Sequence, residues 1–274
     1  MSWIESRTDE EWKIETQKQW GNDPCCAVYA EGEDPGTVPF YDRVRKFRYE
    51  NYAPWMYEAI GFDRYNGKKL LEIGCGMSID LMEFAKGGAI VTGIDLTREP
   101  LEISRKGFES HSLKGEFHRM DSEKLEFPDE SFDVVYSFGV LHHTPNTQKA
   151  IDEIHRVLKP GGEAIVMLYY KNSIHYWWAQ MFIHGVLGLK LFRMSPDELL
   201  SSNVEVSHSG AKPLVKVYNK KQARELFKNF SSTSLEVYQL QRYEIPLISK
   251  LLSDAQVESL GRKFGWFLLI KAVK

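Results

Sequence analysis

The sequence predicts an α/β protein built on a mainly parallel sheet with helices on both faces. The 274 residues are 43% hydrophobic and 27% charged, a composition that is typical of globular chains and excludes an intrinsically disordered one. Between Lys68 and Tyr170, short apolar runs alternate with helical patterns. Strands that alternate with helices in this way form parallel sheets that are covered on both faces.

This alternating region gives the order of the expected elements. Each strand is a short apolar run, and each helix repeats its apolar residues at a spacing of three or four. The last of these helices is stopped by Pro160, Gly161 and Gly162. The expected strands are residues 69–73, 90–94, 116–119, 132–138 and 164–168, and the expected helices are residues 78–86, 97–108 and 148–158.

Two further zones flank the alternating region. Residues 1–66 are expected to form a helical N-terminal cap, whose first helix follows a capping box at Thr8–Glu11. Residues 67–274 are expected to form the main domain, with an inserted helical lid at about 171–215. The elements expected after this lid are a helix over residues 219–230 and two closing strands over residues 235–239 and 264–273.

Charge and cysteine content narrow the class of protein. The chain has 35 lysines and arginines against 38 aspartates and glutamates, so no general attraction to nucleic acid or to an anionic membrane is expected. Three cysteines without a CxxC pair favour neither a disulfide framework nor a structural zinc site, and no metal is expected. The N-terminus lacks the basic and apolar pattern of a signal peptide. A cytoplasmic location is therefore expected.

Aromatic residues are concentrated outside the alternating region. All seven tryptophans lie there, and Trp177 and Trp178 open the longest apolar stretch, residues 177–192. Polar residues interrupt that stretch, which falls short of the roughly 20 apolar residues of a membrane-spanning helix. An interfacial contact with a membrane is compatible with it. The aromatic residues either pack the outer helices or line a substrate pocket, and the second interpretation places Tyr169, Tyr170, Trp177 and Trp178 in that pocket.

A glycine-rich turn follows the first strand. Gly74 and Gly76 allow the backbone to approach a ligand closely and to bend into the next helix. Asp95 ends the second strand, and its carboxylate can accept hydrogen bonds from both hydroxyls of a ribose. Asp121 follows the third strand and can accept from the exocyclic amine of an adenine. Because ligands bind beyond the carboxyl ends of the strands in such sheets, these residues predict an adenosine site.

Two other nucleotide sites do not fit the sequence. The dinucleotide fingerprint requires a third glycine at the position of Ile79, where a helix must approach a pyrophosphate closely. The chain also has no GxxxxGK[ST] loop for a nucleoside triphosphate. The predicted ligand therefore contains an adenosine and no pyrophosphate.

Five motifs follow one another along the alternating region. They are LEIGCG at 71–76, GIDL at 93–96, MD at 120–121, DVVYS at 133–137 and RVLKPGG at 156–162. They resemble the successive motifs of class I S-adenosylmethionine (SAM)-dependent methyltransferases, in the subgroup that includes the ubiquinone and menaquinone methyltransferases. The resemblance implies a Rossmann-like, seven-stranded sheet with an antiparallel last strand. It also implies SAM as the cofactor and S-adenosylhomocysteine as its product. Ser78 departs from the family, which usually has a third glycine there.

The resemblance further implies which residues hold the cofactor. The turn after the first strand lines the methionine end of SAM, the second and third strand ends hold the adenosine, and the fourth strand ends beneath the sulfonium. The residues in these places are Glu72, Gly74, Cys75, Gly76, Asp95, Leu96, Asp121, Ser122, Ser137 and Phe138.

Two histidines are candidates for a catalytic base. His142 and His143 follow the fourth strand at the edge of the expected cleft, and the pKa of histidine suits it to take a proton from an oxygen or nitrogen acceptor. In the alternative interpretation, one or both histidines only shape the loop or contact the cofactor.

We therefore expect a SAM-dependent methyltransferase that acts on a small, partly apolar molecule at oxygen or nitrogen. One alternative is a quinone-type C-methyltransferase or another SAM-using enzyme, and a second is a non-catalytic SAM-binding partner protein. A nucleic-acid methyltransferase is not expected, because Ser137-Phe138-Gly139 stands where an Asn/Asp-Pro-Pro-Tyr motif would follow the fourth strand. The sequence does not determine the oligomeric state.

Overall fold

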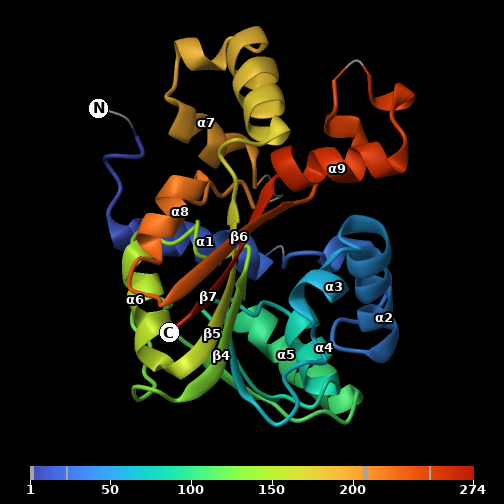
Figure 1. Cartoon of the computed structure of the whole chain (residues 1–274), viewed down its shortest axis with the longest axis vertical. Helices are drawn as coiled ribbons and strands as arrows, with labels where there is room; N and C mark the ends of the chain where they lie inside the picture. The colour runs from blue at the N-terminus through green and yellow to red at the C-terminus, as the bar shows by residue number, and fades with distance from the viewer. Residues whose placement is uncertain (1–2, 23, 206–208, 247) are drawn as a thin grey trace.

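The computed structural model describes residues 3–22, 24–205, 209–246 and 248–274 (Figure 1). Within them lies a seven-stranded sheet of order β3-β2-β1-β4-β5-β7-β6. Strands β1 to β5 pair in parallel, and β7 is antiparallel to both neighbours, β5 and β6. The predicted fold class is confirmed. The strands are β1 (Lys69–Ile73), β2 (Ile90–Asp95), β3 (Glu116–Arg119), β4 (Phe132–Phe138), β5 (Leu158–Tyr169), β6 (Ser232–Tyr238) and β7 (Phe267–Val273).

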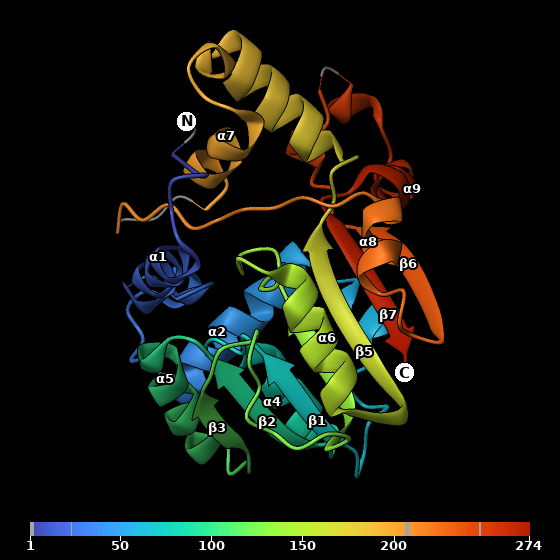
Figure 2. The same cartoon turned by 90° about the vertical axis from the view of Figure 1, so that its left-hand side faces the viewer.

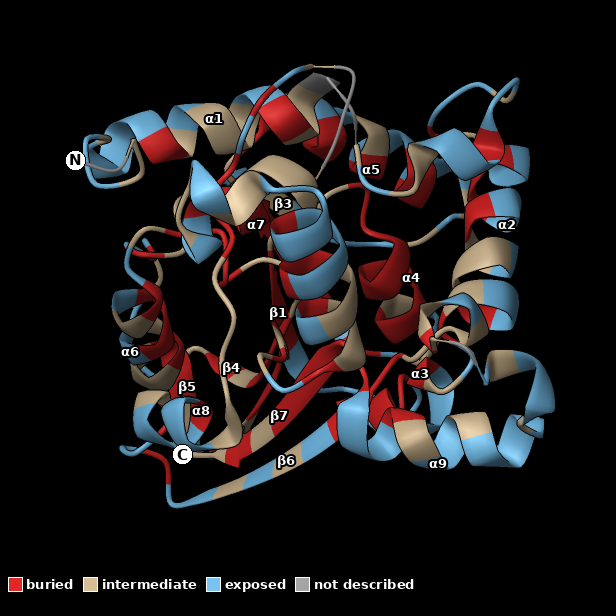
Figure 3. Cartoon of the chain, turned by 90° about the horizontal axis from the view of Figure 1, so that it is seen from above, coloured by how far each residue is buried: buried red, intermediate tan, exposed pale blue. Residues whose placement is uncertain are grey.

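Helices cover both faces of this sheet. Alternate residues of β4 show this directly, because Val134 and Tyr136 belong to one hydrophobic core and Val135 belongs to the other. The helices over the first core include α4 (Ile79–Lys86) and α5 (Arg98–Ser110), and those over the second are α6 (Thr147–Val157) and α8 (Lys220–Leu226). Seen from above, α4 is almost wholly buried (Figure 3).

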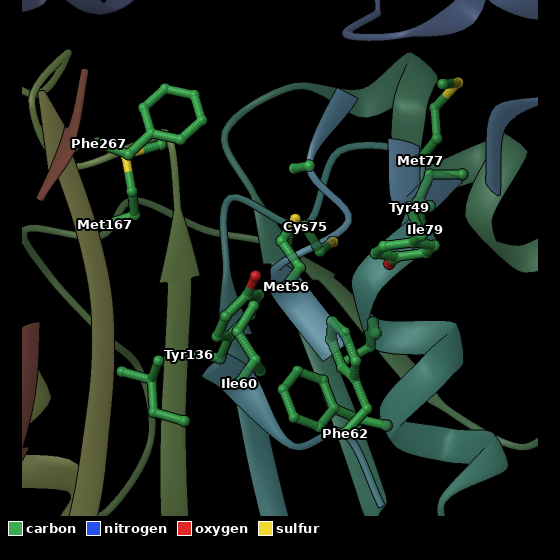
Figure 4. Packing of buried hydrophobic residues seen from close by; sticks show 14 of the residues in the cluster. Tyr49, Met56, Ile60, Phe62, Cys75, Met77, Ile79, Tyr136, Met167 and Phe267 are labelled. Carbon is green, nitrogen blue, oxygen red and sulfur yellow. The ribbon is translucent and has the colours of Figure 1, made fainter. Parts of the chain in front are cut away.

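The N-terminal segment packs against the first of these cores. Helix α1 (Asp9–Asn22) begins after Thr8, whose hydroxyl accepts from the Glu11 N–H while the Glu11 carboxylate accepts from the Thr8 N–H. Met56 and Ile60 lie close to Tyr136 of β4 (Figure 4). The other elements of this segment are η1 (Ala27–Ala30), α2 (Val38–Lys46), the π-helical η2 (Phe47–Tyr52) and α3 (Met56–Ile60).

Strand β5 is longer than the sequence pattern predicts. Residues 159–162, which the sequence pattern predicts as the stop of the preceding helix, form part of the strand, and the pairing with β4 shifts in register between Phe132 and Val134. The strand therefore begins at Leu158 instead of Ala164. A glycine-rich stretch can be extended as well as turned, which is why the pattern placed its start too late.

A helical insertion follows β5 and lies on the side of the sheet toward which the parallel strands point (Figures 1 and 2). It consists of η3 (His175–Leu187), η4 (Lys190–Phe192) and α7 (Pro196–Asn203). Helix α9 (Asp254–Phe264), with η5 (Arg242–Glu244) and η6 (Ser249–Leu251) before it, was not predicted. Its capping box, formed by Ser253 and Gln256, is a local signal for that helix. Of the predicted lid, residues 206–208 lie outside the described residues.

Candidate active site

A cavity of about 490 Å³ lies where the parallel strands end. The arrowheads of β1, β2 and β5 point toward the half of the molecule that holds α1 and the insertion (Figure 2). The cavity is lined by residues at the carboxyl ends of β1, β2, β4 and β5, and by residues of α1, η2 and the segment that follows α7. It is the place at which open α/β sheets bind their ligands.

The glycine turn between β1 and α4 forms the floor of this cavity. Gly74 has a φ of 71°, and a Cβ atom there would lie 2.3 Å from Val140, so only glycine fits. A Cβ at Gly76 would meet no atom within 4 Å. Ser78 precedes α4 with a φ of 60°, and its side chain makes no capping hydrogen bond. The third family glycine thus corresponds to a left-handed position that this chain fills with serine.

Asp95 stands at the end of β2 and faces the cavity. Its carboxylate accepts from the Gly76 N–H at 2.9 Å and from the Thr97 N–H at 2.8 Å. Burial raises the pKa of Asp95, while these N–H groups oppose the rise. The carboxylate therefore fixes the glycine turn and keeps further lone pairs for a ligand. Leu96, the next residue, also lines the cavity.

Asp121 occupies the corresponding place after β3. One of its oxygens accepts from the Glu123 N–H at 2.9 Å, and the other accepts from the Lys13 ammonium of α1 at 2.7 Å. Ser122 lines the cavity beside it. Lys13 lies 108 residues away in sequence, and no local pattern in the N-terminal segment points to its role. This ion pair joins the predicted adenine edge to the N-terminal cap.

A buried ion pair joins the cap to α4 on the other side of the cavity. The Arg48 guanidinium of η2 donates to both oxygens of Asp80, at 2.7 and 2.5 Å. Tyr49 and Tyr136 donate their hydroxyls to the same carboxylate. The Arg48 side chain is 11% exposed, lines the cavity and lies over the Phe138 ring. Such a bidentate, fully hydrogen-bonded pair fixes the position of η2.

Three predicted cofactor residues lie beneath the cavity lining and not in it. Glu72 is buried in β1, and burial raises the pKa of its carboxyl. Cys75 is buried under the glycine turn. Ser137 is fully buried and donates its hydroxyl to the Ile73 carbonyl at 3.1 Å. These residues support the turn and the strand ends, whereas Phe138 does reach the cavity.

The structure separates the two candidate histidines. His143 lines the cavity, and its Nδ1 lies 2.7 Å from the Leu214 carbonyl. His142 is fully buried, and its ring lies tilted against the Tyr169 ring with the two ring centroids 3.8 Å apart. Neither ring nitrogen of His142 has a hydrogen-bond partner among the described residues. Burial lowers the pKa of both histidines. His143 is therefore the histidine that can meet a ligand.

Most of the aromatic residues that the sequence predicts in a substrate pocket do not line the cavity. Tyr169 lines the cavity, but Tyr170, Trp177 and Trp178 do not. Tyr170 is buried beside Tyr218 in the second core. Trp177 is 57% exposed on the insertion, and Trp178 stacks on a neighbouring ring of the same helix. Besides Tyr169, Phe138 and Phe267, the rings that line the cavity come from the N-terminal segment, and they are Trp20, Tyr29, Phe47 and Tyr52.

Two adjacent thiols also line the cavity. The sulfur atoms of Cys25 and Cys26 are 3.5 Å apart. The Cys25 thiol and the Arg48 guanidinium lower the pKa of Cys26 to about 7, while the pKa of Cys25 is raised. Cys26 is therefore the more acidic of the two thiols.

The family model of the methyltransferase domain matches residues 71–166. This segment contains the glycine turn and the two aspartates described above, and it forms the parallel part of the sheet. Residues 71–166 thus match a methyltransferase domain, within a seven-stranded sheet of the Rossmann-like kind found in class I SAM-dependent methyltransferases. SAM is the cofactor of this class, and the carboxylates and open glycine cradle at the strand ends fit its adenosine and its amino-acid end.

Curated relatives resemble part of the chain in sequence, and solved structures share its fold. A ubiquinone biosynthesis O-methyltransferase of Pseudomonas syringae is 34% identical over 125 residues, which cover 45% of this chain and 53% of that protein. The chain thus spans about half the length of this curated relative. The structure of a SAM-dependent methyltransferase from Methanosarcina mazei has a TM-score of 0.54 at 20% identity and covers 80% of this chain and 97% of its own. One from Mesorhizobium loti has a TM-score of 0.54 at 17% identity, with coverages of 82% and 99%.

Sequence reasoning missed several polar residues of the cavity, including the following four. Lys13 and Gln19 come from α1, Thr144 follows the histidine pair, and Glu205 follows α7. None of them belongs to a family motif, and each reaches the cavity only through tertiary packing. The mixed sequence of the insertion gave no signal that would have set Glu205 apart.

Proposed function

We propose that this protein transfers a methyl group from SAM to the oxygen or nitrogen of a small, partly apolar molecule. The observation that supports it is one cavity whose two sides are lined by different kinds of residues. Gly74, Gly76 and Asp95 line one side, whereas His143 and several aromatic rings line the other. A cofactor and an acceptor can therefore meet in one cavity.

The residues of this cavity supply alignment and exclusion of water. Methyl transfer from a sulfonium has a good leaving group, so positioning carries much of the catalysis. Asp95 and Asp121 would hold the ribose and the adenine of SAM, and Phe138 would lie beneath the sulfonium. The aromatic rings of the cap would enclose the acceptor and limit the entry of water.

We assign the role of proton acceptor to His143. Because the Leu214 carbonyl can only accept a hydrogen bond, the Nδ1 of His143 carries the proton and its Nε2 does not. Burial lowers the pKa of His143, which keeps the ring neutral at pH 7. Nε2 is thus available to take a proton from an acceptor.

Single replacement of each histidine tests this assignment. His143→Ala should leave the Kd for S-adenosylhomocysteine within about threefold and lower turnover by roughly a hundredfold or more, the usual contribution of a general base. His142→Ala serves as the matched control, with thermal stability measured for both variants. Unchanged turnover of a folded His143→Ala enzyme would remove His143 from the mechanism.

The reaction itself is tested by release of S-adenosylhomocysteine in the presence of pooled phenols, quinones, amines and carboxylates. Turnover only with quinones, at carbon, would favour the C-methyltransferase alternative. Tight S-adenosylhomocysteine binding without turnover in any pool would favour a non-catalytic SAM-binding partner protein. The O- and N-acceptor proposal expects turnover with phenols, amines or carboxylates.

A surface of the insertion supports a further proposal, contact with a membrane interface. None of the described helices is long and apolar enough to cross a membrane. However, η3 and η4 expose apolar side chains next to Lys190 and Arg193, a combination found in interfacial helices. Binding to anionic liposomes should fall when Leu187 and Phe192 are replaced by serine, and full recovery of the wild type in the supernatant would contradict it. The exposed apolar residues are Trp177, Phe182, Ile183, Val186, Leu187, Leu189 and Phe192.

A further inference from the structure

Glu205 lies in the wall between two cavities. Its carboxylate lines the main cavity and also a second cavity of about 210 Å³. Tyr52 and Tyr169 belong to the same wall. The second cavity extends away from the glycine turn toward Trp266 and Glu244. A molecule bound here can keep one group at Glu205, beside the cofactor cavity, and place the rest of its skeleton in the second cavity.

Glu205 differs from the other charged side chains around this wall. Lys13 is paired with Asp121, Arg48 is paired with Asp80, and Glu244 lies 2.8 Å from the Nδ1 of His175. The Glu205 carboxylate accepts a hydrogen bond from the Tyr169 hydroxyl. Over the described part of the chain, no lysine or arginine lies within 4 Å of it, so this negative charge lacks a permanent cationic partner.

His143 adds a second hydrogen-bond acceptor beside this carboxylate. Its Nε2 lies 3.8 Å from the Oε1 of Glu205. That nitrogen carries no proton, because Nδ1 donates to the Leu214 carbonyl and the neutral ring has only one N–H. Two hydrogen-bond acceptors thus face each other. Their separation is too long for a hydrogen bond, and neither atom carries a hydrogen to donate.

A single donor atom can bridge this gap. A nitrogen placed about 2.8 Å from both Nε2 and Oε1 would make two hydrogen bonds of ordinary length. An ammonium group has several N–H donors and a positive charge that complements Glu205. A neutral hydroxyl has one hydrogen and can donate to only one of the two acceptors.

We propose that His143 and Glu205 form a subsite for a protonated amine, so that the methyl acceptor is an amine nitrogen. This inference rests on the proposed methyltransferase function and narrows its acceptor class from oxygen or nitrogen to nitrogen. Glu205 binds and orients the amine, and His143 takes one of its protons.

The reaction balances with these two groups. The ammonium gives one proton to the Nε2 of His143, and the freed lone pair forms a bond to the methyl carbon of SAM. The bond between that carbon and sulfur breaks, and its electron pair stays on the sulfur of S-adenosylhomocysteine. The product is a methylammonium that Glu205 still neutralises, and His143 releases its proton to solvent.

Binding of matched amine and alcohol pairs tests the subsite without turnover. Benzylamine is compared with benzyl alcohol, and phenethylamine with phenethyl alcohol, by calorimetry or by ligand-observed NMR in the presence of S-adenosylhomocysteine. The wild type should bind the amine more tightly than the alcohol in each pair. Glu205→Gln keeps the shape and the bond to Tyr169, and it should weaken amine binding roughly tenfold to a hundredfold with little effect on the alcohols.

Glu244→Gln is the matched control, since Glu244 lines only the second cavity and is bonded to His175. It should leave the preference for amines unchanged. If it removes the preference while Glu205→Gln does not, the cation site lies in the second cavity and the proposed subsite is wrong. Equal binding of amine and alcohol in both pairs would also overturn it. Failure to bind S-adenosylhomocysteine, or failure of methyl transfer to every acceptor, would instead refute the proposed function.

Discussion

Asp95 and Asp121 on the cofactor side of the cavity each have one hydrogen-bond donor close by in sequence besides a more distant one, whereas the side chains of His143 and Glu205 on the opposite side are held by distant segments. Each aspartate accepts a hydrogen bond from the backbone N–H two residues further on. His143 is fixed by Leu214, 71 residues away, and Glu205 by Tyr169, 36 residues away. Short sequence motifs position the two aspartates, whereas the packing of the insertion and the N-terminal cap positions His143 and Glu205.

This difference explains why one side can be assigned to a family while the other cannot. The cofactor side lies within residues 71–166, which match the methyltransferase domain. His143 also lies within that match, but the opposite side takes further residues from α1, η2 and the segment after α7, which lie outside it. Two ion pairs, Lys13 with Asp121 and Arg48 with Asp80, join residues of the two sides. Breaking them tests whether one side of the cavity depends on the other.

The largest effect is expected from breaking the buried pair that joins η2 to α4. Arg48→Met leaves the Asp80 carboxylate buried without its cation, and this should lower the free energy of unfolding by about 3–5 kcal/mol. Urea denaturation measures it. Arg43→Met is the matched control, because Arg43 pairs with Glu33 while 56% exposed and should cost less than about 1 kcal/mol. Equal losses in the two variants would show that the Arg48 pair does not anchor the cap.

The next effect tests the cofactor side by itself. Asp95→Ala removes the carboxylate that holds the Gly76 N–H and is assigned to the ribose. We expect affinity for S-adenosylhomocysteine to fall by about a hundredfold, as for the loss of charge-assisted hydrogen bonds. Calorimetric titration measures the affinity, and Glu109→Ala, an exposed carboxylate at the end of α5, is the control. Unaltered binding in Asp95→Ala would contradict the assignment.

A smaller effect tests the chemistry of the opposite side. Since the pKa of Cys26 is lowered to about 7, its reactive thiolate is lost as pH falls below that value. Alkylation of Cys26 by iodoacetamide should rise about tenfold between pH 6 and pH 8 and then level off. Mass spectrometry follows the labelling, with Cys26→Ser as the blank. A rate that is still rising steeply above pH 9 would mean that Cys25 and Arg48 do not activate this thiol.

The smallest effect concerns the glycine turn. Ser78 holds a φ of 60°, which costs a non-glycine residue roughly 1 kcal/mol. Ser78→Gly should therefore raise stability by up to about 1 kcal/mol, and Ser78→Val should lower it, since a β-branched residue fits this conformation least well. Thermal unfolding compares the two variants. A stable Ser78→Val protein would mean that the turn changes its conformation and is less fixed than the cofactor side requires.

Much of the fold could be predicted because the strands and helices of the methyltransferase domain carry their own patterns. The runs at 69–73, 116–119 and 132–138 became β1, β3 and β4 with unchanged ends. Helix α9 was missed although its capping box was present and Val257, Leu260 and Phe264 repeat at a spacing of three and four. The start of β5 was misplaced because glycines permit both a turn and a strand.

The residues of the candidate site also differ in how well the sequence predicts them. Gly74, Gly76, Asp95 and Asp121 could be named because their position after a strand places them at the edge of the sheet. Trp177 and Trp178 were assigned to the pocket from composition alone, and the insertion instead carries them away from the cavity lining. An aromatic residue in an outer helix has no periodic signal that tells a pocket wall from a surface.

The sequence by itself determined the parallel sheet, the glycine turn and the carboxylates at the strand ends, because each depends on residues that are close together in the chain. Only the tertiary structure decided which histidine meets the cavity, which rings enclose it, and that Glu205 stands beside His143. The physical reason is that these contacts join segments tens of residues apart. Their packing is fixed by the burial of many side chains at once, and no local pattern records it.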